Sequence, residues 1–207
     1  MSEINKGTEQ KIMEAAQDVF LQKGLDGARM QEIADEAGIN KALLHYYYRT
    51  KEKLFYAVFK WAASQFLPQV SSIMYDKNIG LFEKIRLFVK EYTKILYSRP
   101  FLPLFILHEI TKNPDGMIEI IQSQGINPKI LFEQIETEIK NGQIKPIDPR
   151  AMLINLLSLV VFPVAARPMM QRILFDNDAK AYKSFLDRRV EEVPDFIIHA
   201  IKLEDEH

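Results

Sequence analysis

The chain has 207 residues, with 27 Lys and Arg against 28 Asp and Glu, 47% hydrophobic residues and no cysteine. This composition is enough for a folded core and excludes disordered and collagen-like chains. The lack of cysteine excludes a disulfide scaffold, a thiolate metal site and a cysteine nucleophile, and it fits a reducing compartment. Apolar residues recur at spacings of three and four and seldom at two, which predicts an all-α fold.

The amino-terminal part of the chain predicts four helices separated by short breaks. Their expected ranges are residues 9–23, 30–37, 41–48 and 51–65. Thr8, Asn40 and Thr50 have side chains that can cap the N-termini of the first, third and fourth helices. Gly24 can adopt the left-handed conformation that commonly ends a helix, and Gly38 is expected to stop the second helix.

The rest of the chain is more apolar and also predicts helices. Their expected ranges are residues 81–97, 101–112, 128–141, 148–167 and 179–202. The Asn-Pro-Asp-Gly sequence at residues 113–116 is expected to be a loop. Pro68 is expected to end or kink the fourth helix, and Pro194 to kink or split the last one.

Residues 29–54 contain the pattern that is most informative about function. Two short helices joined by residues 38–40 match a helix-turn-helix, in which glycine permits a sharp reversal and small residues let the helices cross closely. Leu44 and Tyr48 would then face inward on the second of these helices. The outward-facing side chains are Ala42, Leu43, His45 and Tyr46. These side chains would face the major groove of DNA.

The local charge agrees with DNA binding although the whole chain has a net charge of only −1. Residues 38–61 contain five basic residues and one acidic residue, Glu52, which gives a local charge of plus four. The basic residues are Lys41, Arg49, Lys51, Lys53 and Lys60. The salt-dependent part of DNA affinity depends on the phosphates that such a local face neutralises, so a neutral chain can still bind DNA.

Residues 30–54, MQEIADEAGINKALLHYYYRTKEKL, closely resemble the DNA-binding domain of TetR-type transcriptional repressors. The resemblance implies a helix-turn-helix DNA-binding domain over residues 1–50. It further implies a helical effector-binding and dimerisation domain over residues 51–207, with residues 51–67 as a connecting helix. Scaffold positions of the family pattern are occupied by Ile33, Ala34, Ala37, Ile39 and Leu44, and Tyr48 stands at an aromatic core position.

The resemblance also implies which residues contact DNA. These residues are Arg29, Gln31, Asn40, Lys41, Ala42, His45, Tyr46, Tyr47 and Lys51. Three positions depart from the family pattern. Ala42 stands where Gly is common, Leu43 where a small residue or Thr is common, and His45 where Tyr is common. The resemblance therefore predicts the DNA-facing surface and leaves open which bases it contacts.

A small-molecule effector is also implied, bound in a mostly apolar cavity of the second domain, with no cofactor and no metal. The residues expected to line the cavity are Phe88, Tyr92, Phe105, His108, Glu109, Phe132 and Phe162. Among them His108 and Glu109 resemble the start of a zinc-protease motif, but Lys112 stands where the second histidine would be needed.

Dimerisation is expected because one short recognition helix covers only a few base pairs. The predicted helices over residues 148–167 and 179–202 would form the interface, since the first is apolar on nearly every side. The function predicted on this basis is that of a homodimeric repressor. It would bind a palindromic operator and be released by its effector.

Two alternative interpretations stay open. A helical protein-interaction or membrane-surface module without DNA binding would use the basic helices to bind acidic partners or lipid headgroups. An all-α enzyme would need a catalytic cluster around Glu109, and no known catalytic motif in the sequence supplies one, so we expect no enzymatic activity. Residues 151–166 are apolar but shorter than the ~20 residues of a membrane span. No apolar signal segment follows the start, and we expect a cytoplasmic protein.

Overall fold

A computed structural model of the chain describes residues 3–98 and 102–203, with side chains at all of these positions except 3–6, 21, 65, 66, 105, 108 and 109. Within these ranges the regular elements are helices, and the one pairing of extended backbone is an isolated bridge between Ile144 and Lys202. The all-α prediction is therefore confirmed. Packing divides the chain into two compact units, Met1–Gln65 and Phe66–His207.

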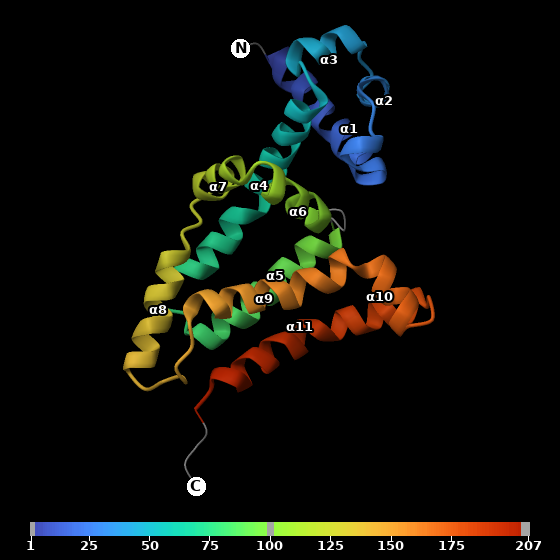
Figure 1. Cartoon of the computed structure of the whole chain (residues 1–207). Coiled ribbons are helices and arrows are strands. Elements are labelled where there is room, and N and C mark those ends of the chain that lie inside the picture. The colour runs from blue at the N-terminus through green and yellow to red at the C-terminus, as the bar shows by residue number, and fades with distance from the viewer. Residues whose placement is uncertain (1–2, 99–101, 204–207) are drawn as a thin grey trace. The chain divides into compact units, whose positions relative to one another are not determined.

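The helices follow one another along the chain in the order that Figure 1 labels. The first unit contains α1 (Glu3–Gly27), α2 (Met30–Glu36), α3 (Lys41–Tyr47) and the first part of α4 (Lys51–Tyr75). The second unit contains the rest of α4, α5 (Leu81–Ser98), α6 (Leu102–Lys112), α7 (Pro114–Ser123), α8 (Pro128–Lys140), α9 (Pro149–Ala165), α10 (Arg167–Leu174) and α11 (Ala179–Ile201). The predicted boundary at residue 50 stays a prediction, because a division by packing does not show where DNA contacts end.

Two of the three expected N-caps in the first unit are confirmed. The Asn40 side chain accepts a hydrogen bond from the Leu43 N–H at 2.8 Å, and the Thr50 hydroxyl oxygen accepts one from the Lys53 N–H at 3.2 Å. Thr8 is not a cap, because α1 begins before it and includes it. Gly24 interrupts α1 with a φ of 67°, and helix continues beyond it to Gly27.

The second unit differs from the prediction at two loops. Residues 113–116 are not a loop, because Asn113 caps α7 and Pro114 occupies its first turn, where a missing N–H is harmless. The helix predicted over residues 148–167 ends at Ala165, and a separate helix, α10, begins at Arg167. No single helix within the described residues is both long and apolar enough to cross a membrane; α9 and α10 meet that test only together, bent by 76°.

The two prolines expected to interrupt helices, and a third one, Pro163, lie inside helices. Pro68 is within α4, Pro163 within α9 and Pro194 within α11, and each helix continues past its proline. A proline removes a single N–H donor, and packing on the rest of the helix can outweigh that loss. The helices therefore neither end at Pro68 nor split at Pro194, and the alternative that each proline kinks its helix stays a prediction.

The turn between α2 and α3 is closed by backbone hydrogen bonds around Gly38. Gly38 has a φ of 66°, its N–H donates to the Asp35 carbonyl at 3.1 Å, and the Ile39 N–H donates to the Ala34 carbonyl at 2.9 Å. This pair of bonds is a Schellman motif, which requires a left-handed residue at the position of Gly38. The chain reversal of the helix-turn-helix therefore depends on the conformational freedom of this glycine.

Replacing Gly38 with alanine is expected to lower the free energy of unfolding by about 1–2 kcal/mol, the penalty for an L side chain in the left-handed region. An added Cβ would meet no atom within 4 Å, so the effect is conformational and not steric. Urea denaturation monitored by circular dichroism measures it. Gly80→Ala is the control, since Gly80 has equally open surroundings and no positive φ. Equal stability of the two variants would contradict this role of Gly38.

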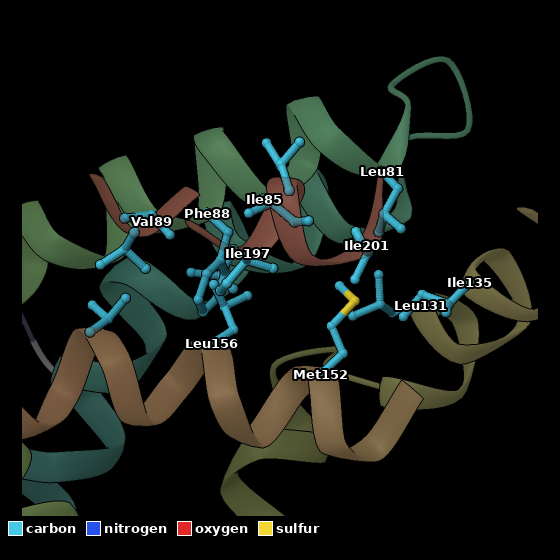
Figure 2. Close-up of a cluster of buried hydrophobic side chains, with 14 of the residues drawn as sticks. Leu81, Ile85, Phe88, Val89, Leu131, Ile135, Met152, Leu156, Ile197 and Ile201 are labelled. Carbon is cyan, nitrogen blue, oxygen red and sulfur yellow. The ribbon is translucent and has the colours of Figure 1, made fainter. Parts of the chain in front are cut away.

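The core of the second unit is built around α5. Figure 2 shows side chains of α5, α8, α9 and α11 that point toward one another. The labelled members are Leu81, Ile85, Phe88 and Val89 of α5, Leu131 and Ile135 of α8, Met152 and Leu156 of α9, and Ile197 and Ile201 of α11. Each of these side chains is buried. The inner faces of α9 and α11 are therefore occupied by contacts within the chain.

Polar contacts hold the C-terminal end of α4 within the second unit. The Tyr75 hydroxyl donates to the Gly125 carbonyl and accepts from the Asn127 N–H, both between α7 and α8. The buried Lys84 ammonium donates to the Met74 carbonyl at 2.8 Å and to the Gln134 side chain at 2.6 Å. Burial lowers the pKa of Lys84. These bonds fix the last turn of α4 to α5 and to the start of α8.

Candidate nucleic-acid interface

The inner side of the helix-turn-helix is a small apolar core. Ile33 and Ala34 of α2 and Leu44 of α3 are completely buried, and Ala37 beside the turn is also buried. The small alanines let α2 and α3 approach closely, as the spacing in the sequence predicts. The neighbouring Ile39 is half-buried. These contacts leave the opposite side of α3 without a packing role.

The opposite side of α3 is exposed and carries the side chains that the sequence assigns to the DNA groove. Ala42, His45 and Tyr46 are exposed, and Tyr46 exposes 81% of its surface. The His45 Nδ1 lies 3.3 Å from the Arg49 carbonyl oxygen. A carbonyl only accepts, so this bond requires a proton on Nδ1 and leaves Nε2 for another partner. The surface formed by Ala42, His45 and Tyr46, with Lys41 beside them, is here called the α3 outer face.

Tyr48 lies on the inner side, as its position on the helical wheel predicts. It is half-buried, and its hydroxyl donates to the Glu9 carboxylate of α1 at 3.1 Å. Burial, and next the Glu9 charge, raise the pKa of the Tyr48 phenol, which therefore stays neutral. Tyr47 is also half-buried, and its ring lies between those of Tyr46 and Tyr48. The tyrosine run thus contains one exposed ring and two that contribute to packing.

Lys51 has a structural partner that the sequence did not reveal. Its ammonium donates to the Ala28 carbonyl at 3.1 Å and to the Asp26 carbonyl at 3.3 Å, which joins the start of α4 to the end of α1. An ammonium has three N–H donors, so one donor stays available for a phosphate. Phosphate binding by Lys51 stays a prediction, and its substitution would also remove two bonds of the scaffold.

The other predicted contact residues lie around the start of α2 and α3. Arg29 precedes α2 and is exposed, and the exposed Gln31 donates to the Asp35 carboxylate at 2.8 Å. The Asn40 side chain is committed to its capping bond, so only its other side-chain atoms can reach DNA. Lys41 opens α3 and is exposed. The structure thus brings all the predicted contact residues into one small unit, most of them exposed.

A cavity of about 550 Å³ lies in the second unit between α6 and α9, here called the α6–α9 cavity. Of the residues predicted to line an effector site, Tyr92 and Phe162 lie in its wall. Phe88 does not, because it points into the core one turn away, and Phe132 on α8 is not among the lining residues either. The side chains of Phe105, His108 and Glu109 lie outside those the structure describes.

The side chains that the structure describes contain no group of three or more His, Asp or Glu that could hold a metal ion. The described residues in the wall of the α6–α9 cavity are apolar apart from two hydroxyl groups, those of Tyr92 and Ser158. Such a wall suits an organic molecule.

Comparisons with known proteins agree with the geometry of the first unit. Residues 12–58 match the family model described as bacterial regulatory proteins, tetR family. The chain is 27% identical to the HTH-type transcriptional regulator RutR of Escherichia coli strain K12, over 92% of this chain and 89% of RutR. The residues matched by the family model, 12–58, include α2, α3 and the start of α4.

The whole chain also shares its fold with solved regulators. The hemolysin II transcriptional regulator HlyIIR is 25% identical, with a TM-score of 0.64 over 96% of this chain and 99% of HlyIIR. The fatty acid degradation regulator FadR from Bacillus halodurans is 19% identical, with a TM-score of 0.66 over 91% of this chain and 93% of FadR. The relatives are regulators and not enzymes. Residues 12–58 therefore form a DNA-binding domain of the TetR family, with α2 and α3 as its helix-turn-helix, and the chain has the fold of solved transcriptional regulators.

Proposed function

We propose that the protein is a homodimeric repressor that binds a palindromic operator through the α3 outer face and is released by a small-molecule effector. The observation that carries the proposal is the division of α3 into two sides. Leu44 is completely buried, whereas His45 and Tyr46 are exposed and lie outside the apolar core. Exposed donors, acceptors and one lysine on a short helix are the groups that read base edges and phosphates in a major groove.

The outer sides of α9 and α11 support the proposed dimer. Ile154 and Phe162 of α9 and Phe196 of α11 are exposed, although the opposite sides of both helices lie in the core. A groove of about 330 Å³ runs between these helices, with the small residues Ser158 and Ala200 in its wall. A second copy would present the same apolar side chains and the same groove, which is the self-complementarity that a twofold interface needs.

Helix α4 supports the proposed link between effector and operator. It is continuous from Lys51, at the helix-turn-helix, to Tyr75, whose hydroxyl contacts the α7–α8 connection. An effector that favours one arrangement of α6 to α8 would therefore act on the end of α4 through these bonds. Effector and operator must then weaken each other's binding by the same factor.

The proposal locates the protein in the cytoplasm, where a bacterial operator lies, and gives it no enzymatic activity. The solved structure of FadR from Bacillus subtilis contains stearoyl-CoA, and FadR is 19% identical to this chain with a TM-score of 0.59. A protein of this fold can thus hold a ligand with a long apolar part. This precedent supports an effector site in the second unit.

Selection of genomic DNA fragments by the purified protein, followed by mobility-shift assays, tests the proposed function. We expect the retained fragments to share an inverted repeat whose half-sites are about one helical turn (~10 bp) or more apart. Fragments without a shared repeat would contradict operator binding. Equal binding to random DNA and to anionic lipid vesicles would favour a general module for acidic partners.

A further inference from the structure

The α6–α9 cavity is long and apolar. One wall comes from α6, with Pro103, Ile106, Leu107 and Ile110. The facing wall comes from α9, between Leu157 and Ala165. At 1.5 Å per residue these segments are roughly 11 Å long, so the space accommodates an extended molecule. Its volume of about 550 Å³ is that of a site for a drug-sized ligand.

The Tyr92 hydroxyl is a polar group in this wall that lacks a partner. No hydrogen bond joins it to any residue that the structure describes, and its ring is held by stacking on Phe88 at a centroid distance of 5.2 Å. Burial raises the pKa of the Tyr92 phenol to about 12, so the group is a neutral donor at physiological pH. Tyr92 is half-buried and lines the cavity, so its hydroxyl can donate to an acceptor atom of a ligand there.

The charge of the wall limits the ligand further. None of the lining side chains that the structure describes is charged. Among these described residues an ionised carboxylate or ammonium would find no counter-charge, and transfer of such a group from water without one is strongly unfavourable. A neutral molecule avoids that penalty.

We propose that the α6–α9 cavity binds a neutral, extended and mostly apolar molecule whose one carbonyl oxygen accepts a hydrogen bond from the Tyr92 hydroxyl. This inference rests on the proposed function, since it names the chemical class of the effector. A side chain of a second copy is a less suitable occupant, because apolar side chains would leave the Tyr92 hydroxyl unpaired. The main-chain carbonyls of a helix would likewise be bonded within that helix.

Displacement of the neutral fluorescent probe N-phenylnaphthylamine from the full-length protein tests this assignment without DNA. The competitors are a medium-chain methyl ketone and the alkane and carboxylate of the same chain length. We expect the ketone to bind most tightly. In Tyr92→Phe the affinity for the ketone should fall roughly three- to tenfold, the equivalent of one hydrogen bond, and the affinity for the alkane should not change.

Two further variants make the result specific. Tyr97→Phe is the matched control, because Tyr97 is also on α5 and its buried hydroxyl lacks a partner, but it lines a separate small cavity. It should leave all three affinities unchanged. Leu157→Trp, which fills the α6–α9 cavity, should abolish probe binding while the circular dichroism spectrum stays that of a helical protein.

Several results would overturn the assignment. These are failure of the probe to bind, a carboxylate that binds as tightly as the ketone, and equal ketone affinity in Tyr92→Phe and the unchanged protein. Because the measurement needs no DNA, a failed operator selection combined with normal ketone binding would reject the repressor function and leave the ligand class intact.

Discussion

Replacing Phe196 with glutamate is expected to convert the proposed dimer into monomers and to abolish operator binding. Phe196 exposes 67% of its surface in the single chain, so the change should not disturb the fold of the monomer. In a twofold interface each substitution occurs twice, and every glutamate would be buried without a counter-charge. We expect dimer affinity to fall by roughly a hundredfold or more. Sedimentation equilibrium measures the mass, and a mobility-shift assay measures operator binding.

The control for this substitution is Ile118→Glu on α7. Ile118 is also a large apolar residue, with 50% of its surface exposed, but it lies on neither α9 nor α11. This variant should stay dimeric and bind the operator normally. If Phe196→Glu stays dimeric, or if Ile118→Glu alone dissociates, the interface is not formed by α9 and α11.

Replacing both His45 and Tyr46 with alanine is expected to remove operator specificity. A good base contact contributes about 1–3 kcal/mol, and each substitution occurs twice in a dimer, so operator affinity should fall at least a hundredfold. Affinity for random DNA should change much less, since the lysines that neutralise phosphates are retained. Both side chains are exposed, and thermal unfolding should not change. Mobility shifts on operator and random duplexes measure the two affinities.

Lys41→Ala provides the matching control for a phosphate contact. Lys41 is exposed at the start of α3, and its loss should weaken binding to operator and random DNA by similar factors. The slope of log affinity against log salt should fall by about two in a dimer, one for each lysine. If the His45 and Tyr46 double variant instead weakens both DNAs equally, its side chains contact only the backbone.

The helix-turn-helix could be predicted because its signals are local. Asn40 and Thr50 cap the helices that follow them, and Gly38 supplies the left-handed residue of the turn. Each signal acts within a few residues of sequence. The division of α3 into a buried Leu44 side and an exposed Tyr46 side follows from helical periodicity alone.

The second unit was less predictable, because residue type alone does not show where all of its helices begin and end. Helix α9 ends at Ala165, and its C-cap, Ala166, has a φ of −89° and a ψ of 10°. Nothing in the residue type of Ala166 indicates a bend. Pro68 and Pro194, which do suggest breaks, lie within continuous helices. Tertiary packing decides these positions, and a single sequence does not report it.

The candidate sites show the same limit. Phe88 and Tyr92 lie one turn apart on α5 and stack on each other, yet only Tyr92 reaches the α6–α9 cavity. Lys51 has the residue type of a phosphate contact, but its bonds to the Asp26 and Ala28 carbonyls depend on how α1 ends beside α4. The bonds of Lys51 depend on contacts between residues that are distant in the sequence. The difference between Phe88 and Tyr92 depends on angles around α5 that are smaller than helical periodicity can distinguish.

The most direct test of operator recognition by α3 is a fluorescence anisotropy titration on the selected palindrome, on one half-site and on a scrambled duplex of equal length. We expect two chains to bind each palindrome, with an affinity about a thousandfold above that for the scrambled duplex at physiological salt. The half-site should bind far more weakly than the palindrome. Equal affinity for the palindrome and the scrambled duplex, or for the palindrome and the half-site, would contradict recognition of DNA by a pair of α3 helices.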